Sequence, residues 1–96
     1  MVSDRASAAV LAVLPAGVEA VVRAGEDGST IEIGDQRLTV CWIGEGQLRD
    51  ARRVLEAEPD TSTIAVARAL SPGAVQALRD ARVGFVDETG AAEIAL

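Results

Sequence analysis

The sequence predicts an α/β domain in which helices pack on a mixed β-sheet, in the order α-β-β-β-α-β-α-β-β. Its 96 residues suffice for one hydrophobic core, so residues 1–96 are expected to form a single domain. Hydrophobic residues make up 49% of the chain, which argues against intrinsic disorder. Their spacing changes along the chain between a helical period and short strand-like runs, and these changes predict the order of elements.

The N-terminal half predicts one helix followed by three strands. Ser3 or Asp4 can cap the helix, and Pro15 with Gly17 ends it. The apolar side chains of this helix share one face: Ala6, Ala9, Val10, Val13 and Leu14. Strands are expected at residues 18–23, 30–33 and 37–43. Because the intervening turns GEDG and GDQ are short, we expect an antiparallel meander, with the apolar run LTVCWI as a central strand covered on both faces.

The pattern then returns to a helical period. A helix is expected at residues 47–58, ended by Pro59. Its inward side chains are Leu48, Ala51, Val54 and Leu55. Its outward side chains are mostly Arg49, Asp50, Arg52, Arg53 and Glu56. The run STIAVARAL follows and predicts a second buried strand.

The C-terminal third predicts a third helix and two further strands. Ser71 is expected to cap the helix, Pro72 to take its first position and Gly84 to close it. Strands are expected at residues 85–87 and in the run AAEIAL, with a turn at residues 88–90. Alternation of strands and helices predicts parallel pairing through right-handed crossovers. The final strand reaches the last residue without a polar tail, so we expect an N-terminal fragment of a longer protein.

Composition and charge restrict the possible functions. The net charge of −6 opposes general nucleic-acid binding by this domain alone, because positive charge supplies most of the affinity for phosphates. The single cysteine, Cys41, excludes an internal disulfide, and without histidine a metal site would depend on carboxylates. A free thiol and the lack of a signal-peptide pattern indicate the cytoplasm. The apolar segment ASAAVLAVLPAGVEAVV is too short and too interrupted to span a bilayer.

The order of elements resembles the core of the restriction-endonuclease-like, PD-(D/E)xK nuclease superfamily, in which a helix, a three-stranded meander, a helix and a strand follow one another. The second half is similar to nuclease-like domains fused to winged-helix regulators and antitoxin-like proteins of bacteria. The matching residues are Leu70, Ser71, Pro72, Gly84, Phe85, Asp87 and Gly90. All nine basic residues are arginine, which together with the alanine content is typical of GC-rich bacterial genomes.

The resemblance implies a nuclease site that this chain lacks. Active members of the superfamily hold Mg²⁺ with an aspartate near the second strand and an acid at the end of the third, followed by a lysine. Aligned with that strand end, VCWI places Cys41 at the acid and Ile43 at the lysine. A thiol is a poor ligand for a hard cation, and isoleucine cannot polarise water. The aspartate of the second strand would fall around Asp27 or Gly28, and Asp27 alone cannot replace the set. The implied domain is degenerate and non-catalytic, with no cofactor.

Four residues are candidates for partner or DNA contact. Trp42 points to the sheet face opposite Cys41, and it is either the main core anchor or a half-exposed aromatic at an interface. Arg49, Arg52 and Arg53 share a helix face and can meet phosphates in a complete protein, but pairs with Asp50 and Glu56 make a solvated face the stronger interpretation.

Other polar residues favour structural roles. Cys41 has no histidine to activate it, and packing is favoured over reactivity. The GEG turn lacks the third glycine of a phosphate cradle, and its glutamate would repel phosphate. Asp87 is expected to support the final turn. The meander turns carry a group of acids that are either solvated turn residues or a two-carboxylate cation site: Glu26, Asp27, Glu32 and Asp35.

Together these features predict the non-catalytic N-terminal module of a bacterial transcriptional regulator or antitoxin-like protein. Its role would be dimerisation, as a homo-oligomer, or partner contact, with DNA bound only by a winged helix outside this fragment. One alternative is a metal-dependent nuclease with a migrated site that uses Glu19, Asp27 and Glu32. Another is a self-associating domain without any nucleic-acid role.

Overall fold

A computed structural model describes residues 5–14, 17–25, 28–59 and 62–94, and within them it has the predicted order of elements. The elements are α1 (Arg5–Val13), β1 (Ala20–Gly25), β2 (Gly28–Ile33), β3 (Gln36–Gly44), α2 (Leu48–Glu56), β4 (Thr63–Ala67), α3 (Pro72–Asp80), β5 (Gly84–Asp87) and β6 (Ala92–Glu93). The structure is therefore mixed α and β, as predicted. The expected caps Ser3 and Asp4, and Pro15 at the end of the first helix, lie outside the described residues.

The strands form one mixed sheet in the order β1-β2-β3-β4-β5-β6. β1, β2 and β3 make the predicted antiparallel meander. β3, β4 and β5 pair in parallel, and β6 returns antiparallel to β5. The two helical crossovers explain the parallel pairs, because a tight turn cannot join parallel strands.

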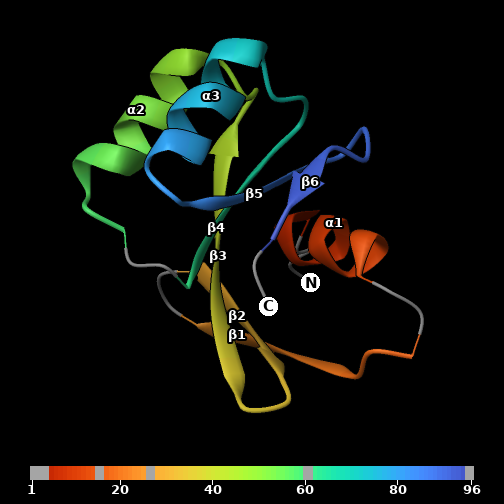
Figure 1. The fold of residues 1–96 in the computed structure, drawn as a ribbon. Coiled ribbons are helices and arrows are strands. Elements are labelled where there is room, and N and C mark those ends of the chain that lie inside the picture. Colours follow the sequence, from red (N-terminus) through yellow and green to blue (C-terminus); the bar gives the residue numbers. More distant parts are fainter. Residues whose placement is uncertain (1–4, 15–16, 26–27, 60–61, 95–96) are drawn as a thin grey trace.

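Helices cover the two faces of the sheet unequally. α1 packs on one face, and α2 and α3 pack together on the other, so the sheet lies between two helical layers (Figure 1). The crossovers β3–α2–β4 and β4–α3–β5 both move the chain one strand toward β6. Two crossovers of the same handedness that move in the same direction place their helices on the same face of the sheet. In the central strand β3, Val40 faces α1 and Ile43 faces α2 and α3.

Each face has its own hydrophobic core. The core under α1 contains Ala9, Val10, Ile31, Leu38, Val40, Ile64, Val66 and Val86. The core under α2 and α3 contains Ile43, Ala51, Ala65, Ala67, Ala74, Leu78, Val83 and Phe85. The second core is rich in alanine, which allows the two helices and the sheet to approach closely.

Local chemistry explains the start of α3 but corrects its predicted end. Ser71 caps the helix as predicted, because its Oγ accepts from the backbone N–H of Ala74 at 3.1 Å. The helix ends at Asp80, and the chain turns at Arg82, whose φ is 61°. Gly84 already belongs to β5, so its predicted role as helix closer is wrong. A Cβ at Gly84 would lie 3.3 Å from the Glu93 carbonyl oxygen, and close packing against β6 explains the glycine.

The other predicted boundaries shift by a few residues. β1 begins two residues later than expected, and α2 is shorter than residues 47–58 at both ends. The predicted strand AAEIAL is reduced to the two residues of β6, and residues 95–96 lie outside the described part. In the described residues, none of the helices is both long and apolar enough to cross a lipid bilayer.

Candidate functional site

The carboxyl ends of β3, β4 and β5 meet at one edge of the sheet, where α/β proteins usually bind their ligands. Here two loops close that edge against each other. The N–H of Ala69 donates to the carbonyl of Glu45 at 3.2 Å, and the N–H of Ser71 donates to the carbonyl of Gly46 at 2.8 Å. An added Cβ at Gly46 would lie 2.3 Å from the Ala69 carbonyl oxygen, so the loops are in direct backbone contact.

Two buried aspartates hold this edge together. Asp50 is 7% exposed, and its Oδ2 accepts from the N–H groups of Gly46 and Gln47 at 3.2 and 3.0 Å. The prediction that Asp50 faces outward from its helix is therefore wrong. Its carboxylate turns back to cap the start of α2, where donors lack helical partners and negative charge is favourable.

Asp87 joins the loop before α3 to the turn between β5 and β6 at the same edge. It is 3% exposed, and its Oδ2 accepts from the N–H of Leu70 at 2.9 Å. Its Oδ1 accepts from the N–H groups of Thr89 and Ala91 at 2.9 and 3.0 Å and from the Thr89 hydroxyl. Burial raises the pKa of Asp87, but these hydrogen bonds outweigh it and lower the pKa below the ordinary value. Asp87 supports the final turn, as predicted, and also anchors the loop before α3.

The end of β3, where an active nuclease would carry its acid and lysine, lies in apolar surroundings in the structure. Ile43 is buried and Cys41 is half-buried, and both pack in the core under α2 and α3. Burial raises the pKa of the Cys41 thiol, so little of the nucleophilic thiolate form is present at neutral pH. Packing is therefore the role that the surroundings of Cys41 favour.

The three acids proposed for a migrated nuclease site are Glu19, Asp27 and Glu32, and the structure describes the surroundings of Glu19 and Glu32. Glu32 forms ion pairs with Arg23 at 3.2 Å and with Arg37 at 2.9 Å, and these guanidinium groups lower the pKa of Glu32. Glu19 is exposed beside β1, and Asp27 lies outside the described residues. Among the residues that the structure describes, no three of the side chains His, Cys, Asp and Glu converge to hold a metal ion.

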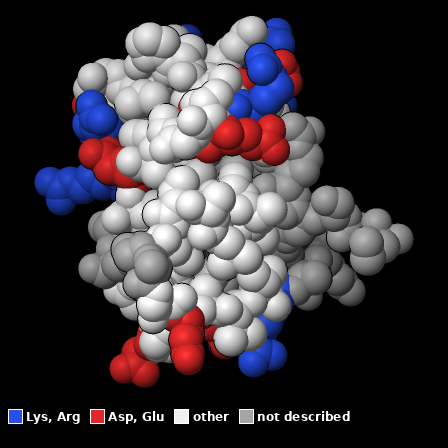
Figure 2. Space-filling view, turned by 90° about the vertical axis from the view of Figure 1, so that its right-hand side faces the viewer, with Lys and Arg blue, Asp and Glu red and all other residues white. Residues whose placement is uncertain are grey.

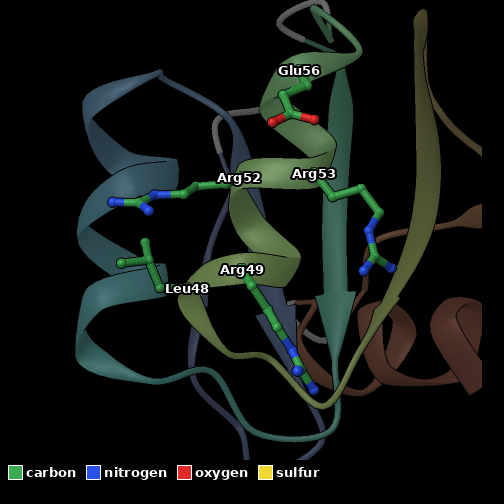
Figure 3. A pocket seen from close by; sticks show the side chains of 5 residues that line it. All are labelled: Leu48, Arg49, Arg52, Arg53 and Glu56. Atoms are coloured by element: carbon green, nitrogen blue, oxygen red, sulfur yellow. The ribbon is translucent and has the colours of Figure 1, made fainter.

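Three predicted contact residues line the same concavity on α2. Arg49, Arg52 and Arg53 line a concavity of about 360 Å³ with Leu48 and Glu56. The three guanidinium groups fan out from the outer surface of the helix (Figure 3). We call these five residues the α2 arginine surface.

The spacing of charges on α2 favoured ion pairs of these arginines with Asp50 and Glu56, and among the described residues the structure does not have them. Within the described part of the chain, none of its three arginines forms an ion pair shorter than 4.0 Å. The expected partner Asp50 is turned inward to the helix start. By contrast, Arg68 pairs with Glu45 at 2.9 Å and Arg79 pairs with Glu93 at 3.1 Å.

Trp42, the fourth predicted contact residue, does not join this surface. Its neighbours Cys41 and Ile43 point toward α2 and α3, so Trp42 points to the face that carries α1. Its exposure of 37% shows that it is not the main core anchor. On the side of the molecule that carries α1 and β6, charged side chains lie toward the top and bottom and the middle is largely uncharged (Figure 2).

Sequence reasoning misses the two loop-closing roles at the sheet edge. Helical spacing places Asp50 on the solvated helix face, although its position three residues after Gln47 matches a capping box and is a signal for the cap. The contact between Gly46 and Ala69 has no local signal, because the two residues are brought together only by parallel pairing of β3 and β4.

Comparison of the chain with protein-family models, curated proteins and solved structures finds no match.

Proposed function

We propose that this domain is a non-catalytic binding module that contacts an acidic segment of a partner protein through the α2 arginine surface. The observation that carries the proposal is the concentration of three arginines without ion-pair partners among the described residues, on a chain of net charge −6. Three positive charges on one helix face create a local positive potential, which favours contact with an anionic partner.

The closed sheet edge supports a role in binding rather than catalysis. The buried carboxylates of Asp50 and Asp87 are engaged by backbone N–H groups, and the backbone contact at Gly46 fills the space between the two loops. Loss of either carboxylate would leave buried N–H groups without an acceptor, so both carboxylates contribute to the stability of the loops. We keep in this proposal the interpretation of the chain as a degenerate relative of the PD-(D/E)xK nucleases, which rests on the order of its elements and on the apolar residues Cys41 and Ile43.

The surface favours a protein partner over DNA. Leu48 contributes apolar area within the concavity, and Glu56 places a negative charge at its end. Arginine beside apolar area is typical of protein interfaces. A DNA backbone would bring many phosphates against a domain of net charge −6, where repulsion opposes the few local contacts. In the complete bacterial regulator that we propose, DNA would be bound by another segment.

The proposal is tested by calorimetric titration with a short oligoglutamate peptide as the probe and a short DNA duplex as the comparison. We expect the peptide to bind the wild type and Arg52→Glu to weaken that binding about tenfold, as is typical of a charged contact. The control Arg79→Glu changes the net charge equally but lies on α3, and it should bind as the wild type does.

Three outcomes would overturn the proposal. Equal losses in Arg52→Glu and Arg79→Glu would show that net charge alone governs binding. Tighter binding of the duplex than of the peptide would make DNA the partner. Cleavage of plasmid DNA that depends on Mg²⁺ and disappears in Asp27→Ala would establish the nuclease alternative.

A further inference from the structure

The strand β1 has an unusual composition for a strand at the edge of a sheet. It pairs with β2 on one side only, and its outer edge has no partner among the described residues. Val21 and Val22 are 53% and 39% exposed, and Arg23 is the strand's one charged residue. Edge strands of monomeric proteins usually carry charged side chains, proline or a bulge that prevents pairing with another chain. The sequence AVVRAG of β1 has neither proline nor a bulge, and its one charge, Arg23, is paired with Glu32.

The side chains along β1 are complementary to themselves when the strand is reversed. Val21 and Arg23 lie on one face of the sheet and Ala20 and Val22 on the other, because neighbouring side chains alternate along a strand. Glu19 is the residue just before β1, and an extension of the strand by one residue would place it on the face of Val21 and Arg23. An antiparallel copy of this segment reads Arg23, Val21, Glu19 against Glu19, Val21, Arg23. Each glutamate then meets an arginine, and valine meets valine in the middle.

We infer that two copies of this chain associate by antiparallel pairing of their β1 strands across a two-fold axis at Val21, which joins the two sheets into one. This interface lies at the sheet edge and not on α2, so it goes beyond the partner contact proposed above. The inward side of β1 stays unchanged, because the pairs between β1 and β2 use the other edge of the strand.

Symmetry and charge select the register. A two-fold axis that generates antiparallel pairing stands perpendicular to the sheet, so only residues on the same face can be opposite each other. An axis at Arg23 would oppose two arginines, and an axis at Val22 would place Val21 opposite Arg23. An axis at Val21 gives two Glu19–Arg23 pairs on one face and two Ala20–Val22 contacts on the other. Opposite charges and apolar pairs directly across a strand pair stabilise it.

The charges within each copy are compatible with this arrangement. Arg23 already contacts Glu32 at 3.2 Å, but Glu32 also contacts Arg37 at 2.9 Å and therefore keeps a partner when Arg23 turns toward the second copy. Glu19 is exposed and forms no ion pair within the described residues. Both groups can therefore take part in a contact between copies at small cost.

The test exchanges charge at the interface and measures mass by sedimentation equilibrium over a concentration series. We expect the wild type to dimerise, and Glu19→Arg and Arg23→Glu each to raise the dissociation constant about tenfold or more, because each variant brings like charges together twice per dimer. An equimolar mixture of the two variants should recover dimerisation, because positions 19 and 23 of one copy then face side chains of opposite charge in the other copy. Far-ultraviolet circular dichroism and a thermal melt confirm that each variant is folded.

A wild type that remains monomeric at every concentration would overturn the inference. So would a dimer whose dissociation constant is unchanged in Glu19→Arg, which replaces an exposed side chain and is expected to fold. If each variant is monomeric but the mixture does not recover dimerisation, the register at Val21 is wrong. Arg79→Glu serves as the matched control, because it changes the net charge by the same amount as Arg23→Glu and also removes one ion pair, to Glu93 on a different surface, and it should leave the dissociation constant unchanged.

Discussion

Replacing Gly46 by alanine is the most direct test of the closed sheet edge. The added methyl group would lie 2.3 Å from the carbonyl oxygen of Ala69 and 2.7 Å from its carbonyl carbon. Both atoms belong to the backbone of the loop before α3, so no side chain can rotate to make room. The backbone at Gly46 also has φ of 98°, which an alanine rarely adopts.

The expected loss of stability has two parts. Strain at a positive φ costs about 1–2 kcal/mol for a residue with a Cβ. Relieving the clash requires the loops to separate, which breaks the hydrogen bonds from Ala69 to Glu45 and from Ser71 to Gly46 at about 1 kcal/mol each. The total of about 3–4 kcal/mol is a large share of the roughly 5–15 kcal/mol that stabilises a domain of this size.

The assay is urea unfolding of Gly46→Ala beside a matched control, Gly90→Ala. Gly90 has a similar φ of 106°, but a Cβ there would meet no atom within 4 Å. The control therefore measures the backbone strain alone, and we expect Gly46→Ala to lose about 2 kcal/mol more than Gly90→Ala. Equal losses in the two variants would refute the contact between the loops and, with it, the closed sheet edge that our proposal of a binding role uses.

Two further predictions concern side chains that hold the same region. In Asp87→Asn the amide group would face the N–H donors that the carboxylate now binds, and we expect the free energy of unfolding at pH 7 to fall by about 2–4 kcal/mol. Because folding lowers the pKa of Asp87, its stabilisation is present above the ordinary carboxyl pKa of about 4 and is lost as the pH falls through the lower folded value. The difference between wild type and variant in urea titrations should therefore shrink below about pH 4, and a constant difference would contradict this role. Ser71→Ala should lose about 1 kcal/mol by removal of the α3 cap and Ser71→Gly only a few tenths, whereas a larger loss in the glycine variant would argue against the cap.

The sequence by itself determined the order of the elements and the local signals at their ends. The change from helical spacing to strand-like runs depends on near neighbours in the chain, so it predicted the meander and the parallel pairs. Ser71 before Pro72 is a helix start by local chemistry alone, and the structure confirms it. The clustering of three arginines on one helix face was equally local.

Only the tertiary structure decided how these elements use their polar and aromatic residues. The direction of Asp50 depends on the loop it caps, and the exposure of Trp42 depends on how far α1 covers the sheet. Gly46 and Ala69 lie in loops that come together because β3 and β4 pair in parallel. Helical and strand periodicity relate only near neighbours in the sequence, so they do not predict this contact. The physical reason is that burial and hydrogen bonding are properties of positions in space, and residues far apart in sequence acquire those positions only when the sheet has formed.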